Sequence, residues 1–465
     1  MRVSEKRRWK RFWIICAALI LLALFQSYLL FWGRGSLLSP ITQTAQEEDT
    51  RSPLQNGDIY ISLGDCDQEN YECSFVKVPG GSSDYLNLSA LVISLLKDNL
   101  TQIPVVDATE EWENVPPVEE TVLVLDLGFM MDEEGIRDEL LLGGGRFPEG
   151  RFDQIWIVPA KTLVEDIRFY FYNSQEKKMM TASGGVYTQS SNRLLLEEMI
   201  HICENVEAGH LWAGRAFDEA FEEDDFIPIP ENREMGNGFL KSVFLGDDET
   251  DPNEMRRYGM SFFAYPDTVN ERIVPDESLQ EKTGLILANE KLTLRIYPDG
   301  RVVYLETLTD LEKEEISLSD AYDLAEAFLE QDLERFPCDP MKVVFAGYES
   351  EGPVKVFYYD YQLEETELVL DEALTREWGQ EWGQPHSIRI EIYGSGVRQY
   401  ERYVMEASLI RRRSTSYQWI EVMDRMVQMG QMPLSRPELV YVQKGQTLMP
   451  MWRTQTKNGY VYFFA

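Results

Sequence analysis

Residues 12–32 form an apolar run, FWIICAALILLALFQSYLLFW, in which no side chain is charged. In a helix such a run spans about 30 Å, the thickness of the hydrocarbon core of a bilayer. Basic side chains gather just before it, between Lys6 and Arg11, which predicts a cytoplasmic N-terminus and an outer body. No small-residue cleavage site follows, so we expect an uncleaved transmembrane helix, with residues 1–11 as its basic cytoplasmic tail. A buried core helix is the structural alternative.

Five side chains within the predicted span suit contact with another transmembrane helix. Small residues let two helices approach closely, and amide or hydroxyl groups can hydrogen-bond between them. These candidate contacts are Ala17, Ala18, Ala23, Gln26 and Ser27. The two polar residues can also be tolerated in the span without a partner, and the sequence leaves both interpretations open.

The charge of the body excludes one class of partner. The chain carries a net charge of −36, and because its first 35 residues are basic overall, the remainder is more acidic still. A surface of this sign repels nucleic acid and anionic membrane surfaces. We therefore expect no nucleic-acid partner.

Composition divides the rest of the chain into four parts. Residues 33–55 are polar, which predicts a linker between bilayer and body. Residues 56–235 mix strand-like and helix-like patterns and predict an extracytoplasmic α/β domain. We expect a first repeat-containing module over 236–385 and a second module over 386–465. The predicted fold class is α+β.

An internal repeat organises the last third of the chain. LRIYPDGRVVYLE at 294–306 and IEIYGSGVRQYER at 390–402 align without gaps at an offset of 96 residues. Each segment has the pattern of two strands around a tight, glycine-containing turn. The repeat therefore predicts two β-hairpins.

A helix and a second pair of strands follow each predicted hairpin. The first helix is expected over 317–336, with Ser319 as its N-cap, and the second over 415–430. The second strand pairs are expected within 341–363 and 438–465. The repeated unit is thus ββαββ, a PepSY-like module, in which a helix covers one face of the sheet and the other face is left for docking.

Residue types that carry chemistry do not form a recognisable set. The chain has three histidines and no zinc-protease, nucleophile-elbow or phosphate-loop pattern. The acidic stretch at 246–254 alternates oxygen ligands somewhat like a calcium loop, but it lacks the glycine and the closing glutamate of that motif. We expect no catalytic residue, cofactor or metal, and a binding or regulatory protein rather than an enzyme.

Two of the five cysteines lie close together in the sequence. Cys66 and Cys73, in GDCDQENYEC, could close a small loop through a disulfide or remain thiols. Their spacing is not a zinc pattern, because no further pair of Cys or His follows nearby. The sequence alone leaves the disulfide open.

The end of the chain resembles the C-terminus of the YycH/YycI family. In that family a strand with the pattern Leu/Val-x-Pro-x-Trp-Arg precedes an aromatic last strand. The length of this chain suits YycH better than YycI. The matching residues are Leu448, Pro450, Trp452, Arg453, Tyr460, Tyr462 and Phe463.

The resemblance implies a function without chemistry. Members of the family are membrane-anchored regulators of an essential Firmicute cell-wall sensor kinase. For this chain the resemblance implies binding to the sensor histidine kinase through the transmembrane span and the outer modules, and restraint of the kinase activity. A sister YycI-like regulator is a further implied partner. The alternatives are a PepSY-like envelope module that inhibits a protease or binds a wall ligand, and an unrecognised hydrolase within residues 56–235.

Overall fold

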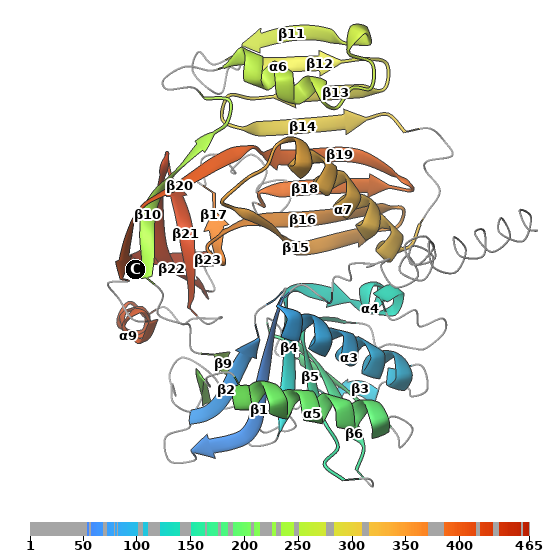
Figure 1. Cartoon of the computed structure of the whole chain (residues 1–465), viewed down its shortest axis with the longest axis vertical. Helices are drawn as coiled ribbons and strands as arrows, with labels where there is room; N and C mark the ends of the chain where they lie inside the picture. The colour runs from blue at the N-terminus through green and yellow to red at the C-terminus, as the bar shows by residue number, and fades with distance from the viewer. Residues whose placement is uncertain are drawn as a thin grey trace, which may run out of the picture. The chain divides into compact units, whose positions relative to one another are not determined.

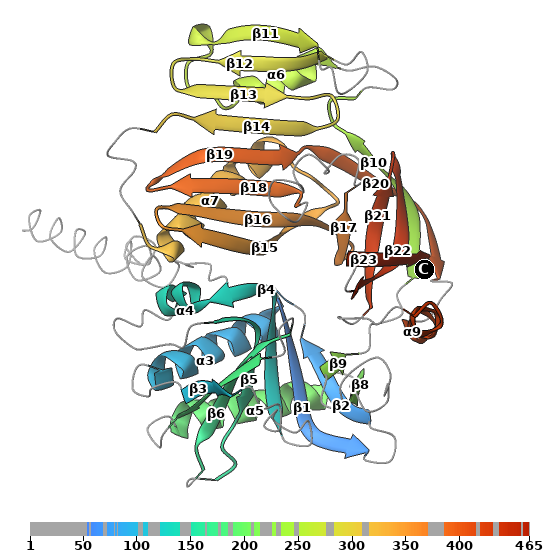
Figure 2. The same cartoon turned by 180° about the vertical axis from the view of Figure 1, so that it is seen from behind.

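The computed structural model describes residues 54–464 apart from a set of internal stretches. The longest of these stretches are 110–120, 140–149, 214–225, 276–282, 309–315 and 371–385. The described residues form two β-sheets with helices packed against them (Figures 1 and 2). The predicted α+β class is confirmed. In the described part of the chain no helix is both long and apolar enough to cross a bilayer, and the predicted span at 12–32 lies outside that part.

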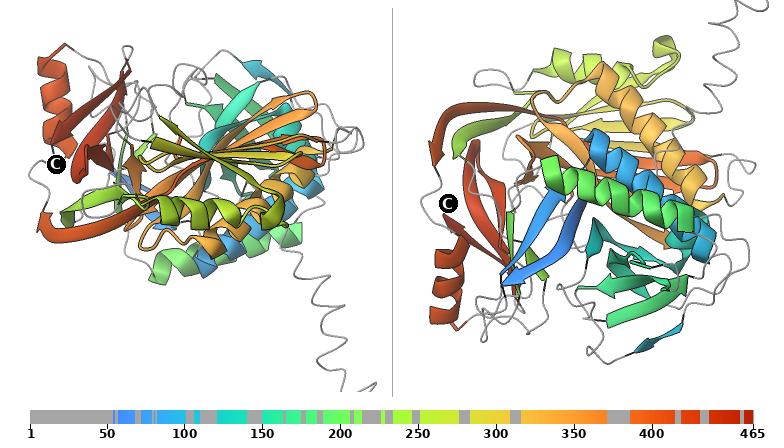
Figure 3. Two further views of the ribbon diagram at one scale, coloured as in Figure 1. Left: turned by 90° about the horizontal axis from the view of Figure 1, so that it is seen from above. Right: turned by 60° about the horizontal axis from the view of Figure 1, so that its bottom comes forward.

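The first sheet has nine strands in the order β3-β7-β6-β5-β4-β1-β2-β8-β9, and all neighbours are antiparallel. In chain order the strands are β1 (Asp58–Asp67), β2 (Glu72–Val78), β3 (Val106–Thr109), β4 (Val122–Asp132), β5 (Arg151–Val158), β6 (Ile167–Asn173), β7 (Lys178–Gly184), β8 (Gly209–Ala213) and β9 (Phe226–Pro228). Helices α3 (Ser83–Leu100) and α5 (Gln189–Asn205) lie side by side against it (Figure 3). A short helix, α4 (Glu133–Glu139), follows β4 directly.

Both faces of this sheet are buried, because successive apolar side chains of its strands point to opposite faces. Ile59 and Ile61 of β1 belong to the core that includes α3, whereas Tyr60 belongs to a separate apolar cluster with Val124 and Trp156. Successive residues of a strand point to opposite faces, so an uninterrupted apolar run covers both.

The second sheet has fourteen strands. Its main path is β11-β12-β13-β14-β19-β18-β16-β17-β21-β22-β10-β20, with β15 paired to β16 and β23 paired to β22. The strands are β10 (Glu234–Ser242), β11 (Asn270–Pro275), β12 (Thr283–Ala288), β13 (Leu292–Ile296), β14 (Arg301–Glu306), β15 (Lys342–Glu351), β16 (Val354–Leu363), β17 (Thr366–Val369), β18 (Ile388–Tyr393), β19 (Gly396–Tyr403), β20 (Met405–Ser414), β21 (Glu438–Lys444), β22 (Thr447–Thr456) and β23 (Gly459–Phe464). Its helices are α6 (Pro252–Met260), the one-turn η5 (Pro266–Thr268), α7 (Leu318–Arg335) and α9 (Trp419–Gln428).

Both predicted hairpins are present, and they are neighbours in the same sheet. β13 pairs with β14 and β18 with β19, and the two hairpins join through β14 and β19. Tyr304 and Tyr400, which the repeat aligns with each other, are direct cross-strand partners. The Phe328 ring of α7 contacts both tyrosine rings, at centroid distances of 5.3 and 5.0 Å. The second hairpin lies between β14 and β16 of the first unit, so strands of the two repeats are interleaved.

The N-cap of α7 differs from the prediction. The helix begins at Leu318, and the hydroxyl of Ser317, not Ser319, accepts the hydrogen bond from the Asp320 backbone N–H at 3.0 Å. The N–H of Leu318 is bonded to a carboxylate oxygen of Asp138 in α4, at 2.6 Å. Ser319 was the wrong choice because Ser317 and Asp320 already bond each other across the first turn, which places Ser319 inside the helix.

A fully buried ion pair connects α7 with the second hairpin. The guanidinium of Arg402 in β19 binds the carboxylate of Asp332 in α7 at 2.6 Å, and the side chains are 0 and 1 % exposed. Arg402 also donates to the hydroxyl of Tyr361, at 3.0 Å, and to the carbonyl of Phe336, at 3.1 Å. Charges this deeply buried are tolerated only when their remaining hydrogen-bonding groups are satisfied.

Tyrosine hydroxyls complete the shell around Asp332. Tyr258 of α6 lies 3.1 Å from one carboxylate oxygen, and Tyr400 of β19 donates to the other. Burial, reinforced by the neighbouring carboxylate, holds the pKa of both tyrosines well above the usual range, so both remain protonated donors. Helices α6 and α7 are therefore fixed to the same face of the sheet by one carboxylate (Figures 1 and 2).

We expect the substitution Asp332→Asn to lower the free energy of unfolding by about 3–5 kcal/mol, because it leaves the buried guanidinium without a counter-charge. Glu334→Gln, at an exposed position of the same helix, is the matched control and should change it by no more than about 0.5 kcal/mol. Urea denaturation followed by far-UV circular dichroism measures both. Equal effects of the two substitutions would contradict the role assigned to the pair.

Candidate functional site

The C-terminal motif lies on the last two strands of the second sheet. Trp452 and Leu448 of β22 are fully buried, and Phe463 of β23 is 9 % exposed. Pro450 is paired with Tyr441 of β21, and both residues lie within a regular antiparallel ladder. The remaining aromatic residues of the motif, Tyr460 and Tyr462, are exposed and half-buried respectively. Three of the seven motif residues are therefore buried in the fold, and three more are half-buried.

Arg453 is the polar centre of this motif. Its two terminal nitrogens bind the two carboxylate oxygens of Glu367 in β17, at 2.6 and 2.7 Å, and one also binds Glu438 in β21 at 2.8 Å. The ring of Tyr460 in β23 lies 4.9 Å from the guanidinium carbon. Burial raises the pKa of Glu367, and the guanidinium opposes that shift. The Arg453 side chain thus connects its own strand, β22, with β17, β21 and β23. Its contact with Glu367 is bidentate, which a lysine could not reproduce.

The other predicted contacts are those with a partner helix in the membrane. Ala17, Ala18, Ala23, Gln26 and Ser27 all lie outside the described residues. Within the described residues no group of three or more His, Cys, Asp or Glu side chains is arranged to hold a metal ion. Of the acidic stretch at 246–254, Asp251 caps α6 by accepting from the N–H groups of Asn253 and Glu254.

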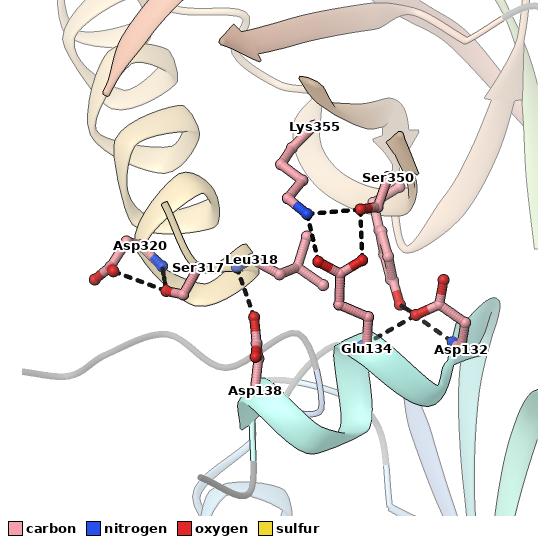
Figure 4. Close-up of polar contacts among 10 residues, drawn as sticks. Asp132, Glu134, Asp138, Ser317, Leu318, Asp320, Ser350 and Lys355 are labelled. Atoms are coloured by element: carbon pink, nitrogen blue, oxygen red, sulfur yellow. Dashed lines mark hydrogen bonds and ion pairs between the residues drawn. The ribbon is translucent and has the colours of Figure 1, made fainter. Parts of the chain in front are cut away.

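A second polar cluster, which we call the joint, connects the first sheet to the second (Figure 4). Glu134 of α4 binds the ammonium group of Lys355 in β16 and accepts from the Ser350 hydroxyl of β15 at 2.6 Å. Lys355 also donates to that hydroxyl, at 2.7 Å, which closes a three-membered network. The Lys355 side chain is only 2 % exposed, whereas Glu134 is 46 % exposed. The buried cation is thus neutralised by α4, the helix that directly follows the central strand β4 of the first sheet.

Asp132 and Tyr348 form the other half of the joint. Asp132 ends β4 and caps α4, since its carboxylate accepts the Gly135 N–H at 2.9 Å. The same oxygen accepts the hydroxyl proton of Tyr348, in β15, at 2.6 Å. Burial and the carboxylate raise the pKa of Tyr348, so the hydroxyl stays protonated and donates. Phe129 adds an apolar contact, with its ring 4.9 Å from that of Phe345.

An open pocket of about 530 Å³ adjoins the joint. Its lining includes side chains of both charge signs, and the basic ones are Arg137 and Arg151. The other lining residues are Asp132, Glu133, Glu134, Asp138 and Gly150. Solvent therefore reaches the acidic side of the joint, while its lysine remains buried.

The joint was not predicted from the sequence, although the sequence of β16 pointed to a buried cation. Successive side chains of a strand point to opposite faces, so Lys355 shares a face with the buried Phe357, Tyr359 and Tyr361. A lysine among aromatic residues on the inner face of a strand requires an acidic partner for its charge. The sequence does not say which of its many acids this is, because the partner lies 221 residues away.

We expect Gly135→Ala to loosen the joint, although alanine normally favours a helix by up to about 1 kcal/mol over glycine. A methyl group at position 135 would lie 2.2 Å from the Tyr348 hydroxyl. Overpacking of this kind should lower the free energy of unfolding by about 1–3 kcal/mol. The measurement is urea denaturation, with amide hydrogen exchange in α4 as the local readout.

Tyr348→Phe provides the matched test of this clash. Removing the hydroxyl should reduce the cost of Gly135→Ala in a double-mutant cycle. An alanine that stabilises the chain equally with and without the hydroxyl would show that the joint is not closely packed at this point.

A histidine–aspartate pair lies near Glu367, one of the two carboxylates that bind Arg453. Nδ1 of His386 is 2.8 Å from Asp360 in β16, and the Ser387 N–H donates to the other oxygen of that carboxylate. The imidazole lies against the ring of Tyr358, at 4.7 Å between centroids. Burial alone would lower the pKa of His386, but the Asp360 carboxylate, together with the nearby Glu367 and Glu349, outweighs burial and raises the pKa above its usual 6.5.

This shift predicts a pH-dependent stability. A raised folded-state pKa contributes stability that is fully present below the unfolded pKa and is lost as pH rises through the folded value. The free energy of unfolding lost in His386→Asn should therefore be larger at pH 6 than at pH 9. His201→Asn, at an exposed position of α5, is the control and should show no such decline. A loss that grows with pH would contradict the assignment.

Comparison with known proteins gives two structural neighbours. No protein-family model matches the sequence, and no curated protein matches it. The fold is similar to the crystal structure of YycH from Bacillus subtilis, with a TM-score of 0.48 and 12 % identity over 89 % of this chain and 97 % of that one. It is also similar to the C-terminal domain of YpeB from Bacillus megaterium, with a TM-score of 0.27 and 16 % identity over 47 % of this chain and 93 % of that one. The first neighbour bears the name of the family that the C-terminal residues resemble.

Proposed function

We propose that this chain is a single-pass membrane protein, with a cytoplasmic N-terminus and an extracytoplasmic body, that regulates a two-component system in cell-wall homeostasis. It would bind a sensor histidine kinase and restrain its activity. The observation that carries the proposal is the C-terminal motif. Its tryptophan is buried and its arginine clamps three neighbouring strands, so the motif defines a fold rather than a reactive site.

Regulation of this kind needs no chemistry in the protein that binds. A partner that binds one state of the kinase more tightly than the other shifts the equilibrium by the difference between its two binding free energies. A difference of about 1.4 kcal/mol already changes the ratio of states tenfold. The apolar run at 12–32, with its small and polar residues, supports contact within the membrane, and the body supplies a second surface.

An envelope module that binds a protease or a wall ligand is the second candidate. Exposed apolar side chains on two neighbouring strands favour it. Phe239 of β10 is 48 % exposed, and Ile410 of β20, next to the strand partner of Gly238, is 61 % exposed. In this case binding would need the body and not the membrane segment.

The two candidates are separated by substitutions in the predicted span. We expect the full chain to co-purify with a sensor histidine kinase from detergent-solubilised membranes. Ala18→Ile should reduce the recovered kinase several-fold, because a bulky residue prevents close helix approach. Leu19→Ile, which keeps size and hydropathy at the next position, is the matched control.

The outcome that contradicts the first candidate is specific. Undiminished recovery of the kinase with Ala18→Ile and with the fragment 36–465 would show that the body binds by itself and would favour the second candidate. Recovery of no kinase with the intact chain would overturn the proposed regulation altogether.

A further inference from the structure

The backbone register of the β1–β2 hairpin places two cysteines opposite each other. The strands pair regularly from Ile59↔Val78 to Ser62↔Phe75, and after an irregularity the ladder resumes with Cys66 facing Cys73. Gly64 lies within the irregular part, with a φ of 84° that favours glycine, and its N–H is bonded to the Ser62 hydroxyl. Three residues of β1 thus oppose one of β2, a bulge that brings Cys66 into register with Cys73.

Directly opposed residues of an antiparallel pair have the spacing that a disulfide requires. Their Cα atoms are about 4.5–5.5 Å apart. Disulfides form between residues whose Cα atoms are about 4.4–6.8 Å apart, and both residues must lie on one face of the sheet. Cα partners across a ladder meet the second condition as well. The register therefore allows the disulfide that the sequence spacing left open.

The position of the pair in the sheet gives the cross-link a structural role. β4 pairs with β1 only from Asp58 to Ser62, so within the described residues the end of β1 beyond the bulge has β2 as its one strand neighbour. β8 pairs with β2 on the far side, at Glu72 to Phe75. A covalent link at Cys66 and Cys73 would fix the register of the part of the hairpin that β4 does not support.

We propose that Cys66 and Cys73 form an intramolecular disulfide that locks the outer part of the β1–β2 hairpin. The two thiols together lose two protons and two electrons as the S–S bond forms. The oxidant is a disulfide, either of glutathione or of a dithiol oxidoreductase, whose own S–S bond is reduced to two thiols. The cross-link in cells rests on the proposed extracytoplasmic location, because disulfides persist in oxidising compartments.

The remaining described cysteines provide internal controls. Cys203 of α5 and Cys338 are free, and Cys338 is buried. Burial raises the pKa of the Cys203 thiol to about 11, which keeps it protonated and slow to exchange. Neither forms a disulfide with another described cysteine. Both should therefore remain thiols under the conditions that oxidise Cys66 and Cys73.

The test is peptide mapping of the full chain isolated from membranes after free thiols are blocked by alkylation. We expect a peptide that links Cys66 to Cys73, absent in Cys73→Ser and retained in Cys203→Ser. In the oxidised chain, amide hydrogen exchange at residues 66–73 should be at least about tenfold slower than after reduction, and Cys66→Ser should show the fast rate with or without reductant.

Recovery of both cysteines in alkylated form would overturn the proposal. Treating the purified, reduced chain with oxidised glutathione then identifies which premise failed. Closure in vitro would place the error in the extracytoplasmic location, and with it in the proposed function. Mixed disulfides without closure would place the error in the pairing itself and would leave the proposed function untouched.

Discussion

The contact between Asp332 and Arg402 holds together the parts of the second sheet that the sequence keeps apart. The aspartate belongs to the helix of the first repeat, and the arginine to the hairpin of the second. Because neither charge reaches solvent, each must be neutralised by the other and surrounded by hydroxyl and carbonyl groups. The hydroxyls come from α6, β16 and β19 and the carbonyl from Phe336 at the end of α7, so one buried pair determines where several elements sit.

The same principle recurs at two other places, each time with a cation in a strand. Lys355 is held by α4 of the first sheet, and Arg453 by carboxylates of β17 and β21. In a chain with a net charge of −36, the 80 acidic side chains far outnumber the 44 lysines and arginines. A buried cation therefore specifies its location more strongly than any single carboxylate does, since many acids are available but few are within reach, one for Lys355 and two for Arg453.

The sequence predicted local elements well and their pairing partners poorly. Alternation and turn glycines located the hairpins at β13–β14 and β18–β19, because a hairpin is decided by residues adjacent in the chain. The repeat did not reveal that Tyr304 and Tyr400 face each other across two strands, because pairing between distant strands leaves no local pattern. The sequence also could not show that the Leu318 N–H at the start of α7 is satisfied by Asp138 of α4. Asp332 was overlooked because a carboxylate on a helix is normally taken for a solvated one.

What the sequence determined by itself is the material of the fold: the apolar run, the alternating strands, the repeated hairpin and the aromatic C-terminal motif. All of these depend on spacing along the chain, which governs the direction of side chains in helices and strands. Only the tertiary structure decided that the repeats interleave, that Lys355 meets Glu134, and that Cys66 faces Cys73. These are contacts between residues brought together by register and burial, and which of many acids or strands becomes the partner is settled only when the whole core is packed.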